Sequence, residues 1–210
     1  MVASSAASAA SAESLGQDIE LDTAALRVLA HPLRLNVLTL LRERGPSTAT
    51  RIADELGINP AAASYHLRRL GAGGFIVEES GRGTGRERWW KSAHRQSIHD
   101  PASASASAEQ REAGRGYTHA VALAAADRLR RAAHEVPLLP EEWLDAATYS
   151  DFLLYLTPGD VDRMRAEIFQ VISRYRHGEG EAPEGAVPVA LQVQAFPVPG
   201  TALPPAGGGA

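Results

Sequence analysis

Apolar residues recur at helical spacing early in the chain and predict two consecutive helices between residues 23 and 44. Pro32 interrupts the pattern, because proline disfavours helix at the preceding residue, His31, and suits the first position of a new helix. Gly45 then ends the second helix. The apolar positions are Leu26, Leu29, Leu33, Val37, Leu38 and Leu41.

A short helix, a tight turn and a further helix follow. Ser47 can cap the short helix and Gly57 can end it. After the turn 57–59, Asn59 can cap the next helix and Pro60 suits its first position. This spacing is typical of a helix-turn-helix. The short helix has one apolar face, formed by Ala49, Ile52, Ala53 and Leu56.

The helix that begins at Pro60 has two chemically different faces. Ala63, Leu67 and Leu70 share one face and should pack inward. The other face has the residues expected of a recognition helix, since small residues let the backbone enter the major groove while hydroxyls and arginine reach base edges and phosphates. An ordinary surface helix is the alternative. The outward residues are Ala61, Ser64, Tyr65 and Arg68.

Two strand-like runs, 75–80 and 87–93, flank the glycine-rich stretch 81–86 and predict a hairpin. A basic hairpin directly after a helix-turn-helix indicates a winged helix, whose wing lies on the phosphate backbone or in the minor groove. A solvated charged hairpin is the simpler alternative. The hairpin is basic through Arg82, Arg86, Arg88, Lys91 and Arg95. The full set of residues predicted to bind DNA is Ala61, Ser64, Tyr65, Arg68, Arg69, Arg82, Arg86, Arg88 and Lys91.

The net charge of −4 is unevenly distributed. Residues 23–99 carry twelve basic and six acidic side chains, +6, which leaves nine basic and nineteen acidic elsewhere, −10. The basic part, residues 23–99, should therefore meet a polyanion, and the acidic remainder should not.

Low-complexity stretches suggest the boundaries between parts of the chain. The expected parts are a tail at 1–19, a DNA-binding domain at 20–99, a linker at 100–115, a C-terminal dimerisation or effector domain at 116–197 and a tail at 198–210.

The C-terminal part predicts a helix at 117–135 followed by strand, helix and strand. The helix has an apolar side that suits either a dimer mate or its own domain. The run 149–156 is strand-like, Thr157 caps the second helix, and 187–196 alternates like a half-buried strand. Two strands make a marginal sheet, so this unit should pair with a second copy or lie on the helical domain. The expected fold is thus mainly α with α+β elements: a winged helix-turn-helix domain plus a C-terminal helix and a strand-helix-strand extension. The helix's apolar side comprises Val121, Ala125, Leu129 and Ala132.

Five features in order, "HPLRLNVL", "ADELGI", "SYHLRRL", "GGFI" and a basic wing, resemble the ArsR family of bacterial transcriptional regulators over residues 23–95. The resemblance implies a homodimer that binds palindromic double-stranded DNA and has a repressor-like role. It also implies that Ala61, Ser64, Tyr65 and Arg68 face the DNA. It also places His66 where the family usually has histidine before a buried leucine. Metal-sensing members commonly have thiolates where this chain has Thr48 and Thr50, so metal sensing at that helix is not expected.

The absence of cysteine excludes disulfides and thiolate metal sites. His119 and His134 lie too far apart on one helix to share an ion, and no cofactor is expected. With no catalytic motif, an enzyme is not expected, and without a membrane-length apolar run we expect a cytoplasmic protein. The alternative to a DNA-binding regulator is a small-molecule sensor or enzyme-like C-terminal domain to which DNA binding is secondary.

Overall fold

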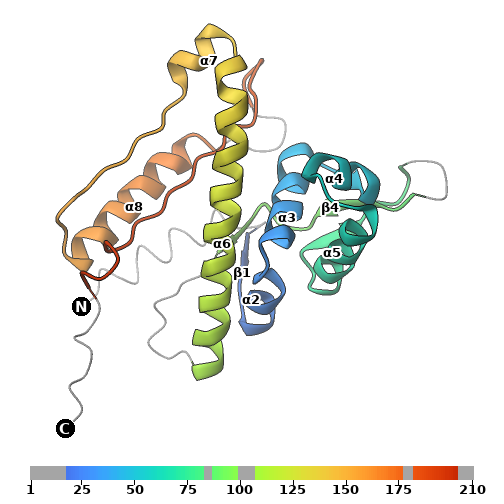
Figure 1. The fold of residues 1–210 in the computed structure, drawn as a ribbon, viewed down its shortest axis with the longest axis horizontal. Helices are drawn as coiled ribbons and strands as arrows, with labels where there is room; N and C mark the ends of the chain where they lie inside the picture. The colour runs from blue at the N-terminus through green and yellow to red at the C-terminus, as the bar shows by residue number, and fades with distance from the viewer. Residues whose placement is uncertain (1–17, 83–86, 99–106, 177–181, 203–210) are drawn as a thin grey trace. The chain divides into compact units, whose positions relative to one another are not determined.

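The computed structural model describes residues 18–82, 87–98, 107–176 and 182–202 (Figure 1). The chain divides into two compact units, residues 1–139 and 140–210. Among the described residues no single helix is long and apolar enough to cross a membrane. The helices Thr23–Leu29 and Pro32–Arg44 together have the length and composition of a membrane span, but they are bent by 92° at the short break between them.

The first unit begins with two helices, α2 (Thr23–Leu29) and α3 (Pro32–Arg44), as the sequence predicts. His31 separates them and caps α3, because its Nδ1 accepts a hydrogen bond from the Leu33 N–H at 3.2 Å. Gly45 ends α3 with a φ of 76°, a value that glycine adopts without strain. Proline and glycine therefore set both ends of α3.

The helix-turn-helix consists of α4 (Ala49–Leu56) and α5 (Pro60–Ala72). Gly57 ends α4 in the left-handed conformation, and the Asn59 side chain caps α5 through the Ala62 N–H at 2.7 Å. The predicted cap of α4 was wrong by one residue. Thr48, not Ser47, accepts the Arg51 N–H, because the strand pair with β4 extends through Thr48 and the helix begins only at Ala49.

The predicted hairpin is present as β3 (Ile76–Glu78) and β4 (Trp89–Ser92), which pair antiparallel. A short strand that the sequence did not predict, β2 (Ser47–Thr48), joins the other edge of β4, so the sheet has the order β2-β4-β3. A second small sheet pairs β1 (Asp18–Glu20) with β5 (Gln96–Ile98) in parallel. The central strand of the larger sheet therefore belongs to the hairpin.

The core of this unit lies between the helices and the sheet. The three inward positions predicted on α5, Ala63, Leu67 and Leu70, are all fully buried, and Ile52 and Ala53 of α4 are buried with them. The apolar face predicted on each of these helices is confirmed. The other buried hydrophobic members of the cluster are Leu21, Leu26, Leu29, Val37, Leu38, Leu41, Phe75, Ile76 and Ala113.

A long helix, α6 (Ala108–Glu135), runs beside α2 and α3 (Figure 1). It begins nine residues before the expected start at 117, because Ser107 caps it through the Gln110 N–H at 3.1 Å. Residues 108–115, expected to be linker, are thus helical. The helix buries small residues, Ala113 and Ala120, against its own unit, and a one-turn 3₁₀ helix η1 (Val136–Leu138) follows it.

The second unit contains α7 (Glu141–Ala146) and α8 (Pro158–Arg174). Thr157 and Asp160 form the capping box expected at the start of α8. The strands predicted at 149–156 and 187–196 are absent, and both segments are irregular. A strand needs a neighbour for its backbone hydrogen bonds, and neither segment has one among the described residues.

Candidate nucleic-acid interface

Helix α5 presents one face to solvent while the opposite face is buried. Ala61, Arg68 and Arg69 are exposed, the Tyr65 side chain is half exposed, and Ser64 is half-buried. The buried face holds the helix firmly, because its three apolar residues are completely covered. The predicted outward residues of α5 therefore lie on its solvent side, where a ligand can reach them.

A buried polar cluster supports the inner side of α5. The His66 ring is 6% exposed and lies 4.8 Å from the His31 ring, centroid to centroid, and 5.2 Å from the Tyr65 ring. The Nδ1 atom of His66 has no hydrogen-bond partner among the described residues. His66 thus packs in the buried cluster that supports α5, directly before the buried Leu67.

Arg34 completes this cluster and joins it to α2. Its guanidinium, which is largely buried, donates to the carbonyl oxygens of Val28 and Arg27 at the end of α2. Burial lowers the pKa of His66 and that of His31 below the usual range for histidine, and the positive charge of Arg34 lowers both further. Both rings therefore resist protonation.

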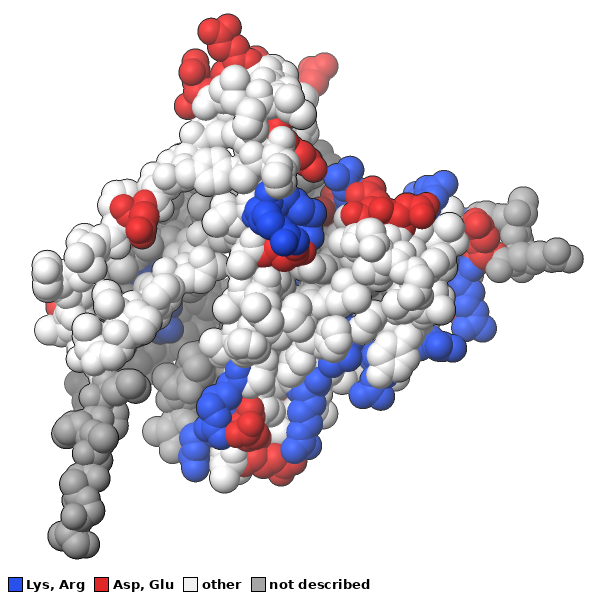
Figure 2. All heavy atoms as spheres, viewed as in Figure 1, with Lys and Arg blue, Asp and Glu red and all other residues white. Residues whose placement is uncertain are grey.

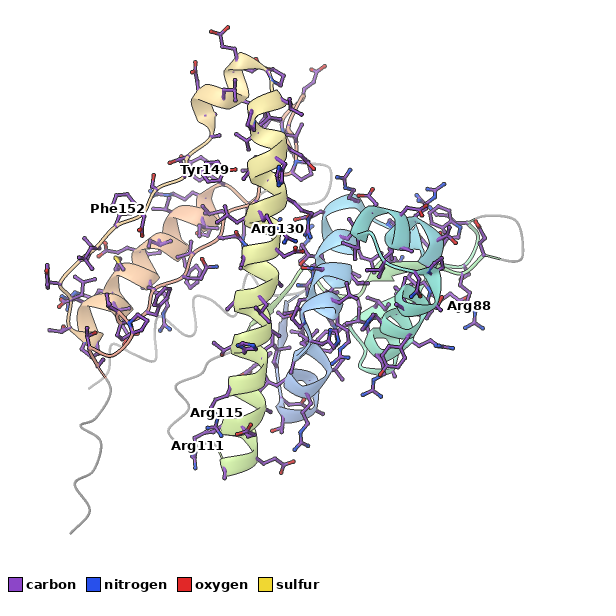
Figure 3. The ribbon with its side chains drawn as sticks, viewed as in Figure 1. Arg88, Arg111, Arg115, Arg130, Tyr149 and Phe152 are labelled. Atoms are coloured by element: carbon purple, nitrogen blue, oxygen red, sulfur yellow. The ribbon has the colours of Figure 1, made fainter. Side chains whose placement is uncertain are left out.

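The wing carries exposed cations close to its strands. The side chains of Arg82, Arg88 and Lys91 are 56%, 71% and 49% exposed, so all three can reach an outside partner. Arg82 and Lys91 each lie 3.6 Å from Glu79. Figure 3 shows Arg88 projecting from the wing. The remaining predicted wing residue, Arg86, lies outside the described residues.

Two residues that the sequence did not single out belong to this surface. Arg51 lies in the first turn of α4, with its guanidinium carbon 4.8 Å from the ring centroid of Trp89. Trp89 is buried in β4, and Arg82 of the wing lies over the same ring at 5.7 Å. The position of Arg51 in the helix before the turn was a usable signal, since the first helix of a helix-turn-helix crosses the DNA backbone.

Basic side chains line the side of the first unit that carries α5, and others lie on α6. Figure 2 shows Lys and Arg atoms along this edge, with fewer acidic atoms among them. Within this unit, polar contacts elsewhere join α3 to α6: Asn36 donates to Asp127 at 3.0 Å, and Arg128 pairs with Glu43. Within the part of the chain that the structure describes, no three His, Asp or Glu side chains gather in a way that could hold a metal ion. The geometry suits a polyanion on one side of the unit.

Comparison with solved structures finds similar chains, all with low TM-scores and low sequence identity. A winged helix-turn-helix domain from Mycobacterium bovis, described as homodimeric and as a possible ArsR-family transcriptional regulator, is 24% identical, with 49% of this chain and 79% of that one covered and a TM-score of 0.30. ZitR from Lactococcus lactis is 14% identical, with 69% and 82% covered and a TM-score of 0.28. The adhesin competence repressor of Streptococcus pyogenes is 13% identical, with 67% and 80% covered and a TM-score of 0.28.

The family comparison is more direct. A family described as a helix-turn-helix domain matches residues 29–79, which span α3, α4, α5 and β3. None of the curated proteins compared with the chain matches it. The match covers the helices whose geometry is given above, and the antiparallel sheet β2-β4-β3 supplies the wing. Residues 29–79 therefore form a helix-turn-helix domain, and with the strands around them the chain carries a winged helix-turn-helix of the kind found in DNA-binding transcription regulators.

Proposed function

We propose that this protein is a sequence-specific transcription regulator that binds double-stranded DNA as a homodimer and acts as a repressor. The observation that carries the proposal is how α5 packs. The inner face of α5 is fully buried, while Tyr65, Arg68 and Arg69 remain exposed beside a basic wing. A firmly held helix with an exposed polar face is what major-groove reading requires. Repression is the role implied by the resemblance to ArsR regulators.

The proposed contacts fall into two kinds. Ala61, Ser64, Tyr65 and Arg68 would enter the major groove and meet base edges, where the small side chains allow close approach of the backbone. The remaining cations would bind phosphates, which gives affinity without sequence information. This phosphate-binding set comprises Arg69, Arg82, Arg86, Arg88 and Lys91.

A second copy is proposed because the described residues of the 140–210 unit form no buried core. None of its described residues is buried, and Figure 3 shows Tyr149 and Phe152 on the irregular segment that precedes α8. Six of its aromatic side chains are more than half exposed: Tyr149, Phe152, Tyr155, Phe169, Tyr175 and Phe196. Covering them would remove on the order of 100 Å² each, a large part of the roughly 800 Å² that each partner buries in a standard interface.

We therefore assign residues 20–99 to DNA binding and residues 116–197 to dimerisation, with an effector site in the same region as a further prediction. Two helix-turn-helix units related by a two-fold axis would read two half-sites about one helical turn apart. No catalytic role is assigned, and a DNA-binding role would place the protein in the cytoplasm.

The test is a mobility-shift assay with the full-length protein and the DNA upstream of its own gene. We expect a discrete complex that survives an excess of random DNA, and reporter repression that depends on the same fragment. Binding to both DNAs with equal affinity at one fixed salt concentration would reject sequence-specific recognition. Activation of the reporter would reject the repressor role alone.

A further inference from the structure

Trp89 lies beneath two arginines that come from different elements of the winged helix. The guanidinium carbon of Arg51, in α4, is 4.8 Å from the centroid of the Trp89 ring, and that of Arg82, after β3, is 5.7 Å away. Both distances fall within the range in which a cation is attracted to an aromatic face. One ring therefore connects the first helix of the helix-turn-helix to the wing.

The ring itself is held in place by the fold. Trp89 is 9% exposed and belongs to the central strand β4, where it pairs with Thr48 of β2. Thr48 is also the cap of α4 and accepts the backbone N–H of Arg51. The backbone position of Arg51 and the ring beneath its side chain are thus fixed by the same pair of strands.

The position of Arg51 does not favour the stability of its helix. The first turn of an α-helix carries a partial positive charge, so a cation there is unfavourable. That turn contains no acidic residue, and Arg51 has no carboxylate within ion-pair distance in the described parts of the chain. Among the residues that the structure describes, Arg82 forms an ion pair with one carboxylate, that of Glu79, which it shares with Lys91. The site as a whole has an excess of positive charge.

We propose that Trp89 is a positioning residue that holds Arg51 and Arg82 together as a clamp on the DNA phosphate backbone. The proposal rests on the proposed function. A guanidinium attracted to an aromatic ring uses none of its N–H donors in that contact, so the donors stay free for phosphate oxygens. Because the ring limits the motion of both side chains before binding, less conformational entropy is lost when they meet DNA.

The experiment is a double-mutant cycle with the full-length protein, in which Trp89→Leu removes the aromatic face and Arg51→Lys keeps the charge but loses the flat guanidinium. Dissociation constants for an operator fragment and for random DNA are measured over a salt series. We expect each single variant to weaken both DNAs by about 3- to 10-fold, from the size of cation–π energies. The fold-loss of affinity in the double variant should be much smaller than the product of the two single fold-losses. Trp89→Phe, which keeps a ring, should restore most of the affinity that Trp89→Leu removes.

Multiplicative losses in folded variants would overturn the clamp, because they would show that Trp89 and Arg51 act independently. Trp89→Leu could lower the melting temperature so far that this cycle cannot be measured. A cycle between the exposed variants Arg51→Lys and Arg82→Lys then decides in its place. Losses of binding free energy that add in the second cycle would count against the clamp. Failure of the wild-type protein to bind either DNA would instead refute the proposed function. The two failures are therefore distinguishable.

Discussion

The ring of His66 in α5 lies against the ring of His31 at the start of α3, with centroids 4.8 Å apart and planes inclined by 52°. This pair joins the recognition helix to the cap of α3, since His31 also accepts the Leu33 N–H. The charged neighbour on α3 is Arg34, which itself interacts electrostatically with Arg69 and Tyr65 of α5. A proton added to either ring would meet the positive charge of Arg34.

This arrangement predicts a loss of stability in mild acid. Burial, with Arg34, lowers the pKa of both histidines in the folded state, so the unfolded chain takes up protons first as the pH falls. Stability is then complete above the unfolded value of about 6.5 and declines as the pH falls from there toward the lowered folded values. Urea unfolding at several pH values from about 7.5 to 5 should show the free energy of unfolding falling by at most about 1.4 kcal/mol per pH unit for each histidine.

The matched variants are His66→Phe, which keeps an aromatic ring, and His31→Asn, which keeps a neutral capping side chain. Each should flatten the pH dependence. His119, which is exposed on α6, serves as the control through His119→Asn. An unchanged pH dependence in both cluster variants would show that other groups cause the acid sensitivity.

The helical part of the DNA-binding domain was largely predictable from the sequence because local signals determine it. Pro32, Gly57 and Asn59 act on the backbone next to them, and the periodic leucines show which side of each helix is buried. The exception was the start of α4, where a non-local strand pair between residues 47–48 and β4 delays the helix to Ala49 and makes Thr48 the cap in place of Ser47. The Arg51–Trp89 contact was missed for the same reason, since only the sheet brings these two residues together.

The 140–210 unit shows the opposite case. The alternation of Val187, Val189 and Leu191 has the period of a strand, but these side chains are more than half exposed and the segment is irregular. Strand formation depends on a partner, and a sequence pattern cannot say which chain supplies it. The capping box of α8, which needs only Thr157 and Asp160, was predicted correctly.

Gly73 offers a test of how α5 fits against its neighbours. A Cβ atom at this position would lie 3.0 Å from Val28 Cγ1 and 3.1 Å from the Phe75 ring, so Gly73→Ala must displace the core. We expect a loss of about 1 to 3 kcal/mol in the free energy of unfolding, measured by urea titration. The control is Gly159→Ala in the first turn of α8, where a Cβ atom meets only Thr157 Oγ1 at 3.9 Å. A Gly73→Ala protein with the same free energy of unfolding as the wild type would show that α2 and α5 can move apart without a loss of stability.

The wing should contribute affinity rather than specificity. Arg88 is 71% exposed, and Arg88→Ala should weaken binding to operator and random DNA by similar factors. The salt slope should fall by about one unit, because one phosphate is no longer neutralised. Arg82→Ala and Arg86→Ala should behave alike. Arg130→Ala removes the same charge from α6, where Figure 3 places Arg130, and should leave the slope unchanged. Loss of affinity at only one DNA sequence would mean that Arg88 reads bases.

Dimerisation should depend on the apolar face of the 187–198 segment. Light scattering at micromolar concentration should give about twice the monomer mass of 22.3 kDa. Leu191 is 65% exposed, so Leu191→Glu should lower the mass toward that of the monomer without a loss of folding. Gln194→Glu adds the same charge at a polar position of the same segment without removing an apolar side chain, and should remain a dimer. A monomeric wild-type protein, or a Leu191→Glu variant that still dimerises, would reject this face as the interface.

Arg68 separates sequence recognition from general affinity for DNA, because it lies on the exposed side of α5 directly after the buried residue Leu67. If Arg68 contacts a base edge, Arg68→Ala should cost about 1 to 3 kcal/mol at the operator and much less on random DNA. If it contacts only phosphate, both DNAs should weaken in proportion. The measurement is the ratio of the two affinities at one fixed salt concentration.

Two further variants make that ratio interpretable. Leu67→Ala removes a fully buried side chain and should cost about 2 to 5 kcal/mol of stability through the cavity that it leaves. It therefore shows what a folding defect does to both DNAs, which an exposed Arg68 variant should not reproduce. Ser64→Ala and Tyr65→Ala examine the rest of the outward face, and each should narrow the difference between operator and random DNA. Unchanged ratios for Arg68, Ser64 and Tyr65 variants, all with wild-type melting temperatures, would exclude α5 from sequence recognition and leave only a basic surface.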